Sequence, residues 1–181
     1  MKIKVVRDLM VPLAEYATVS QDATLYDAVM ALEEAQFKFD QHHYKHRAVL
    51  VYDEQQKVVG KLSQLDVLRG LEPGYSEIKE IEVYELSPSY IKSMMKDFNL
   101  WQTPMETIFK NARDIFVKDI MYTPAEGEYV REETNIDEAI HQLVVGRHQS
   151  LLVTRGEEVV GILRLTDVFM TVCEMIKKHN S

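Results

Sequence analysis

Apolar positions recur along the chain in an order of strands and helices that occurs twice. Continuous apolar runs rich in β-branched residues predict buried strands, and apolar residues three and four positions apart predict helices. The first occurrence consists of a strand at 17–20, a helix from Thr24, strands at 48–52 and 57–62, and a helix at 63–70. In the second, Asn135 caps a helix with Glu138 as its partner, 150–154 is a buried strand, a further strand ends at Leu163, and a helix runs to about Lys178.

The two occurrences also match residue by residue. Residues 6–10 (Val-Arg-Asp-Leu-Met) return as 117–121 (Val-Lys-Asp-Ile-Met), an offset of 111. Residues 58–68 align with 159–169 at an offset of 101, and six of these eleven positions are identical. The chain therefore contains two copies of one strand–helix–strand–strand–helix unit.

The alignment sets the expected architecture. The first repeat is about ten residues longer, and most of the extra residues fall within 37–46. Each repeat leaves an apolar face that the other copy can cover. We therefore expect an α+β fold of two β-α-β-β-α repeats, at 1–71 and 117–181, packed with pseudo-twofold symmetry around a helical insertion at 72–116.

The inter-repeat segment, 72–116, has two helix starts. Ser87-Pro88 is one and Thr103-Pro104 with Glu106 is the other, since each joins a capping residue to a proline at the first helical position. One apolar face follows each start, formed by Ile91, Met94, Met95 and Phe98 and by Met105, Ile108, Phe109 and Ala112. We expect two amphipathic helices that cover the core or a partner subunit; a Met-rich docking surface for another protein is the alternative.

Charge and cysteine content narrow the class of protein. The 181 residues carry a formal net charge of −8, which argues against binding to nucleic acid or to anionic membranes. The single cysteine, Cys173, supports neither a disulfide framework nor a multi-cysteine zinc site and indicates a reducing compartment. With no apolar run of membrane-spanning length and no signal-peptide core at the start, we expect a cytoplasmic protein.

The openings at 6–10 and 117–121 and the ends of both repeats carry a resemblance to a known family. Residues 60–66 read Gly-Lys-Leu-Ser-Gln-Leu-Asp, and 161–167 read Gly-Ile-Leu-Arg-Leu-Thr-Asp. Over 6–71 and 117–176 the chain resembles a tandem pair of CBS (cystathionine β-synthase) domains, a Bateman module, whose repeats end in Gly-h-h-(Ser/Thr)-x-x-Asp with h apolar. Lys61 departs from the apolar pattern, and Arg164 stands where the hydroxyl residue is usual.

The resemblance implies a function. Such pairs bind AMP, ADP, ATP or S-adenosylmethionine in two clefts between the repeats, form homodimers and regulate a partner protein, which the sequence does not name. None of the GxSxG, P-loop, HExxH or GxGxxG motifs occurs in the chain, so we expect no catalysis and no required cofactor. The alternative is a structural module for dimerisation and protein interaction that has no nucleotide ligand.

The resemblance also assigns residues to the two clefts. Cleft A is expected to combine Ser63, Asp66, His46 and Arg47 with the opposite repeat's 122–129, which ends at Tyr129. Cleft B is expected to combine Arg164, Thr166, Asp167 and His148 with 12–18, which ends at Thr18. An Asp carboxylate can accept hydrogen bonds from both hydroxyls of a ribose, and the His-Arg pair and the helix N-terminus favour a phosphate.

Several residues admit two interpretations. Arg164 either donates to a phosphate or neutralises Asp167 and leaves cleft B empty. Ser63 and Asp66 also form an ordinary capping box, which is compatible with ligand binding.

The remaining unusual residues are expected to be structural. His42 and His46 share a helix face if 42–46 is helical, but no further ligand cluster lies nearby, so we expect a polar insertion or a path for phosphate rather than a metal site. Cys173 is expected to be a buried apolar residue, and Trp101 to pack between the linker helices.

Overall fold

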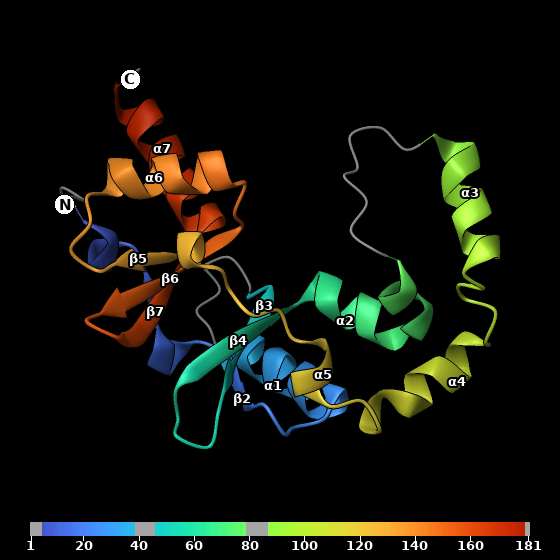
Figure 1. Ribbon diagram of the computed structural model, residues 1–181. Coiled ribbons are helices and arrows are strands. Elements are labelled where there is room, and N and C mark those ends of the chain that lie inside the picture. The colour runs from blue at the N-terminus through green and yellow to red at the C-terminus, as the bar shows by residue number, and fades with distance from the viewer. Residues whose placement is uncertain (1–4, 39–45, 79–86, 180–181) are drawn as a thin grey trace.

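The computed structural model describes residues 5–38, 46–78 and 87–179 and contains two small sheets (Figure 1). In the first sheet, β2 (Thr18–Ser20) runs parallel to β3 (Ala48–Tyr52), which pairs antiparallel with β4 (Val58–Ser63). In the second, β5 (Tyr129–Arg131), β6 (Ser150–Arg155) and β7 (Glu158–Arg164) repeat that arrangement, and β1 (Val11–Pro12) adds to β7. The predicted strands are confirmed to within about a residue.

Helices cover one side of each sheet (Figure 1). The longer ones are α1 (Leu25–Lys38) and α2 (Gln64–Leu71) in the first repeat, and α6 (Ile136–Gly146) and α7 (Leu165–His179) in the second. Short helical turns complete the repeats: η1 (Val6–Asp8), η2 (Leu13–Glu15), α5 (Val117–Ile120) and η5 (Glu126–Glu128). A further turn, η3 (Pro73–Glu77), begins the inter-repeat segment. Each repeat has its own apolar core between helices and sheet. A third core, which includes Tyr16, Leu50, Leu152 and Ile162, lies between the two sheets and joins the repeats.

The repeats exchange backbone hydrogen bonds in a symmetrical way. Val11 pairs with Ile162 on β7, and Tyr122 pairs with Lys61 on β4. These two pairs are equivalent by the sequence offsets, since 11 + 111 = 122 and 61 + 101 = 162. The structure thus confirms the expected α+β fold of two β-α-β-β-α repeats with pseudo-twofold packing.

The inter-repeat segment forms α3 (Pro88–Asp97), α4 (Met105–Lys110) and η4 (Asn111–Arg113). Ser87 caps α3 as predicted, because its hydroxyl accepts from the Tyr90 N–H at 3.2 Å. The second start differs: Pro104 itself is the N-cap of α4 and makes no side-chain cap bond, so Thr103 does not cap this helix. The buried carboxylate of Glu72 ties the segment to the end of α2, since it accepts from the Trp101 backbone N–H at 2.7 Å.

The apolar faces of α3 and α4 are only partly covered. Ile108 is buried, but Ile91, Met95, Met105 and Phe109 are exposed, and α3 stands apart from both sheets (Figure 1).

Two smaller sequence predictions hold only in part or fail. Asn135 is the N-cap of α6, as predicted, but its side chain makes no cap hydrogen bond. Cys173 on α7 is half-buried rather than buried. Trp101 packs edge-on against Tyr75 and donates to its hydroxyl at 3.1 Å, which confirms its packing role. Asp40, His42 and His43 lie outside the described residues.

Candidate functional site

The carboxylate assigned to cleft A lies at the start of α2, where β4 ends. Asp66 Oδ2 accepts from the Ser63 backbone N–H at 2.8 Å and from the Ser63 hydroxyl at 2.6 Å. The Ser63 Oγ in turn faces the Asp66 N–H at 3.3 Å. Among the described residues, no donor reaches Asp66 Oδ1, so this oxygen keeps its lone pairs for a ligand.

A largely buried ion pair involves Lys61 of β4, two residues before Ser63. Lys61 of β4 donates to Glu128 of the opposite repeat, and the Tyr122 hydroxyl donates to Glu128 Oε1 at 2.5 Å. Burial opposes the charge on Glu128, but these two donors outweigh it and hold the pKa of Glu128 below its usual value. The ammonium of Lys61 also lies 5.2 Å from the centre of the Tyr122 ring. This pair therefore links β4 of the first repeat to η5 of the second.

The carboxylate assigned to cleft B has a different partner. Arg164 at the end of β7 donates to Asp167 twice, from Nε to Oδ2 at 2.5 Å and from Nη2 to Oδ1 at 2.6 Å. Both side chains are largely buried, with 6% and 10% exposed. Both oxygens of Asp167 are thus engaged by one guanidinium, which is the neutralising alternative considered for Arg164.

His46 lies in cleft B, not beside Asp66. The Arg164 guanidinium approaches His46 Nδ1 at 3.3 Å, and the His46 ring meets the Tyr16 ring at 70° with centroids 4.3 Å apart. Since Arg164 can only donate, a hydrogen bond between these groups requires a neutral ring with Nδ1 as the acceptor. The expectation that His46 joins Ser63 and Asp66 failed because the chain before β3 turns its side chain toward the opposite repeat.

Burial and charge perturb both aromatic groups in cleft B. His46 is only 1% exposed, and this burial, together with the positive charge of Arg164, lowers the pKa of His46 to about 4. Burial also raises the pKa of Tyr16 to about 12. Both side chains are therefore neutral at pH 7, and Arg164 and Asp167 are the charged pair of this cleft.

The other assigned residues are spread more widely. Arg47 is exposed, and its carbonyl accepts from the Gln64 N–H at 3.2 Å, which places it beside the start of α2. Thr166 is half-buried in the first turn of α7, next to Asp167. The His148 ring lies against Gly146 at the end of α6, where an added Cβ would meet Nε2 at 2.1 Å.

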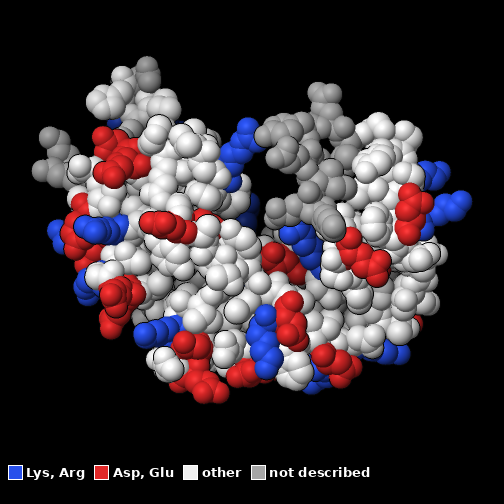
Figure 2. Space-filling model, in the orientation of Figure 1, with Lys and Arg blue, Asp and Glu red and all other residues white. Residues whose placement is uncertain are grey.

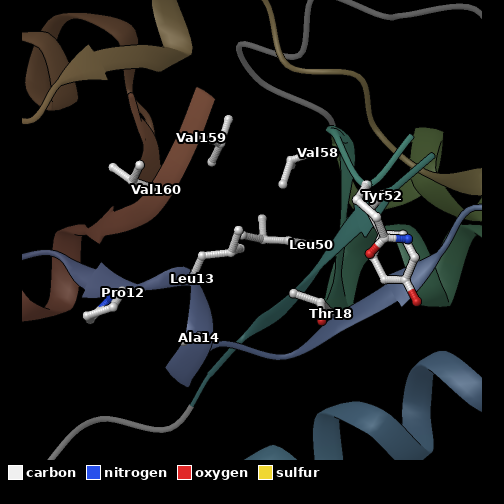
Figure 3. Close-up of a pocket in the computed structure, with 10 residues that line it drawn as sticks. Pro12, Leu13, Ala14, Thr18, Leu50, Tyr52, Val58, Val159 and Val160 are labelled. Carbon is white, nitrogen blue, oxygen red and sulfur yellow. The ribbon is translucent and has the colours of Figure 1, made fainter. Parts of the chain in front are cut away.

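Thr18 and Tyr129 occupy equivalent positions but have different surroundings. Tyr129 packs against the core between the sheets. Thr18 lines a cavity together with Leu13, Tyr52 and Val159 (Figure 3). Neither Arg164 nor Asp167 lines this cavity, so Thr18 stands apart from the charged pair of cleft B.

Sequence reasoning missed Tyr16, Tyr122 and Glu128. The only signal was Lys61, a charged residue at an apolar position of the repeat ending, which required a buried partner from the opposite repeat. The segment 122–129 contains that partner, but spacing alone could not distinguish Glu128 from Glu126.

The surface charge, the possible metal ligands and the hydropathy of the helices can also indicate function. Figure 2 shows acidic and basic side chains interspersed on the face in view. Within 5–38, 46–78 and 87–179, no group of three His, Cys, Asp or Glu side chains is arranged to hold a metal ion. In the same part of the chain, no helix combines the length and the hydropathy needed to cross a bilayer.

Comparisons with known proteins agree with this architecture. The chain aligns with a CBS-pair protein from Arabidopsis thaliana, CBSX2, at 19% identity and a TM-score of 0.61, over 97% of this chain and 99% of that one. A structure of CBSX2 in complex with AMP aligns at 21% identity and a TM-score of 0.58, over 94% and 97%. The CBS domain of a bacterial CNNM/CorC family Mg²⁺ transporter in complex with ATP aligns at 18% identity and 0.58, over 93% and 87%.

Identities this low establish the fold alone. A search of curated proteins gave no match, so the family is assigned from a comparison with protein-family models. The CBS domain family matches twice, at residues 6–73 and 117–174, which together make up more than half of the chain. The chain therefore belongs to the CBS-domain family and is a tandem CBS pair.

Proposed function

We propose that this tandem CBS pair is a non-enzymatic regulatory module that binds an adenosine-containing ligand between its repeats and signals occupancy to a partner protein. The candidate ligands are AMP, ADP, ATP and S-adenosylmethionine. The observation that supports this best is the Asp66 carboxylate at the start of α2, with Oδ2 fixed by Ser63 and Oδ1 without a donor among the described residues. A ribose diol supplies the hydroxyl donors that such an oxygen accepts.

Cleft A is the working site in this proposal. The exposed Arg47 lies beside the start of α2, where its guanidinium can donate to a phosphate. In cleft B, by contrast, a ligand has to displace the guanidinium of Arg164 from Asp167 before a ribose can bind. The complexes of related pairs with AMP and ATP support an adenine nucleotide as the ligand.

The cross-paired strands provide a route for the signal. Lys61 hydrogen-bonds to Tyr122 through the backbone and to Glu128 through the side chain, so these contacts join the two repeats. A ligand that binds between the repeats fixes one repeat relative to the other. A partner that distinguishes the two arrangements would then respond to occupancy.

The test is calorimetric titration of the four candidate ligands into the wild-type chain and into Asp66→Ala. Loss of a hydrogen bond to a charged group costs about 1.5–3 kcal/mol, or roughly ten- to a hundredfold in Kd. Asp27→Ala is the matched control, because Thr24 and Asp27 form the same three hydrogen bonds at the start of α1, outside both clefts. Both variants lose a helix cap, but only Asp66→Ala is expected to lose affinity. Equal affinity in all three proteins would refute the assignment of cleft A.

A second candidate function, homodimerisation and protein docking without a nucleotide, is favoured by a different observation. Leu65 and Leu68 on α2 and Phe169 and Ile176 on α7 are each more than half exposed. A second copy could cover these helix faces symmetrically. Sedimentation at tens of micromolar tests the homodimer, and a monomer at that concentration would exclude it. If the chain is dimeric and none of the four ligands binds, this function replaces the first.

A further inference from the structure

A cavity of about 650 Å³ opens between the two repeats, away from both carboxylates (Figure 3). It is lined by Val58 at the first position of β4 and by Val159 near the start of β7, whereas Ser63 and Arg164 end these strands. Neither Asp66 nor Asp167 lines it. The cavity takes part of its lining from the 12–18 segment that was assigned to cleft B, but it includes neither carboxylate and not Arg164. Its volume falls within the range of small-molecule sites.

The chemistry of the lining defines what the cavity can hold. Aliphatic side chains from both repeats supply most of it, among them Leu13, Leu50, Val58 and Val159. Thr18, Tyr52 and Gln56 contribute groups that can donate or accept hydrogen bonds. All of the lining residues are uncharged, so a charged occupant would lose its hydration without gaining a partner.

The two repeats differ at one pair of equivalent positions beside the cavity. Thr18 pairs with Leu50 across β2 and β3, and Tyr129 pairs with Leu152 across β5 and β6. The sequence offset relates them as well, since 18 + 111 = 129. In the second repeat the phenol of Tyr129 packs into the core between the sheets. In the first repeat the smaller Thr18 lines the cavity.

We propose that this cavity is a second binding site, specific for a neutral, largely apolar small molecule with one or two hydrogen-bonding groups. The aliphatic lining and the hydrogen-bonding groups of Thr18, Tyr52 and Gln56 indicate this chemistry. Val58 and Val159 come from different repeats, so an occupant bridges them and its binding is sensitive to how the repeats pack.

The experiment uses N-phenyl-1-naphthylamine, a neutral aromatic probe whose fluorescence rises in apolar surroundings. Wild-type protein is expected to bind it saturably. Thr18→Tyr copies the other repeat at the same strand register and should fill the cavity, with at least a tenfold loss of probe affinity. Thr107→Tyr, the same change at an exposed position of α4, should bind the probe like wild type.

Methyl NMR of the wild-type chain keeps the test independent of how well Thr18→Tyr folds. Probe addition should shift the methyl signals of Leu13, Val58 and Val159, and leave those of Leu68 and Ile176 on the exposed helix faces unchanged. Shifts confined to the helix faces would show that the probe binds exposed apolar surface and would overturn the proposal. Undiminished binding to folded Thr18→Tyr, or no binding to wild type up to the solubility of the probe, would also overturn it.

Discussion

Arg164 donates two parallel hydrogen bonds to Asp167, three residues further along the chain, at 2.5 and 2.6 Å. At the equivalent point of the first repeat, the hydroxyl of Ser63 donates to Asp66 at 2.6 Å. Each helix thus has an Asp at the equivalent position of its first turn. A guanidinium donates to Asp167, whereas a hydroxyl donates to Asp66. Because a bidentate Arg–Asp pair occupies both carboxylate oxygens, the two clefts are chemically unequal.

Replacing Arg164 by the usual hydroxyl residue is expected to make the clefts alike. Arg164→Ser frees the oxygens of Asp167 and restores the hydroxyl donor that Ser63 provides in the first repeat. In calorimetry with the ligand that cleft A binds, we expect a second binding event that is absent from wild type. Asp167→Ala in wild type is expected to change affinity less than Asp66→Ala, because Asp167 is already engaged.

The opposite result has a clear meaning. If Arg164→Ser or Asp167→Ala abolishes binding while Asp66→Ala leaves it intact, cleft B is the working site. Arg164 would then be the principal phosphate ligand. The variants must be compared at a temperature where thermal unfolding shows each to be folded, since both carboxylates also stabilise their helices.

Arg47 is expected to discriminate ligands by their phosphate. Its side chain is exposed beside the start of α2, where a phosphate would complete the contacts of the ribose. Arg47→Ala should therefore weaken AMP by about tenfold and leave adenosine almost unchanged. Arg69→Ala, an exposed change in the last turn of α2, is the control. Equal losses for AMP and adenosine would contradict a phosphate contact.

The buried pair of Lys61 and Glu128 should be costly to break on one side only. Lys61→Ile leaves the Glu128 carboxylate, 3% exposed, without its main countercharge, and such losses cost about 3–5 kcal/mol. The other repeat shows an apolar solution, because the equivalent positions are Ile162 and Ala17, both buried. The double change Lys61→Ile with Glu128→Ala should recover most of the lost stability.

Urea unfolding of the wild type, both single variants and the double variant measures this coupling. The Tyr122 hydroxyl donates to Glu128 and loses this acceptor in the double variant. The double variant is therefore expected to recover most, but not all, of the free energy of unfolding. A double variant no more stable than Lys61→Ile would show that the ion pair is not interchangeable with the apolar pair.

The repeated pattern in the sequence was sufficient to predict the fold. The offsets of 111 and 101 paired equivalent elements, and the structure confirms them down to the matched bridges of Val11 with Ile162 and Tyr122 with Lys61. The spacing of apolar residues predicts strands and helices because it depends only on residues close together in the sequence. The Ser63–Asp66 capping box was predictable for the same reason, since its partners are three residues apart.

The clefts depend on side-chain directions that local patterns do not encode. His46 stands next to Arg47 in sequence, yet its ring packs on Arg164 and Tyr16 while Arg47 is exposed. Successive residues of an extended segment point to opposite sides, and the sequence alone did not show which side faced the other repeat. The ion pair of Lys61 with Glu128, 67 residues apart, depends in the same way on how the repeats pack.

The final prediction concerns pH. His46 has a pKa of about 4 in the folded chain against an ordinary value of 6.5, because it is buried and faces Arg164. Between these two values the unfolded chain binds a proton that the folded chain does not. Stability is therefore full above pH 6.5 and falls as the pH drops toward 4, by up to about 1.4 kcal/mol per pH unit.

The change from pH 6.5 to 4.5 should lower the melting temperature by about 5–10 °C for a chain of this size. His46→Gln keeps an acceptor for Arg164 but does not titrate, so its melting temperature should vary much less over this interval. Glu128, Glu132 and Asp27 have lowered pKa values, and their contributions are lost only as the pH falls below their ordinary values of 4.5, 4.5 and 3.8. The interval above pH 4.5 therefore isolates His46 from these carboxylates. Parallel melting curves for wild type and His46→Gln from pH 6.5 to 4.5 would show that the His46 ring accepts its proton without cost and is not held between Tyr16 and Arg164.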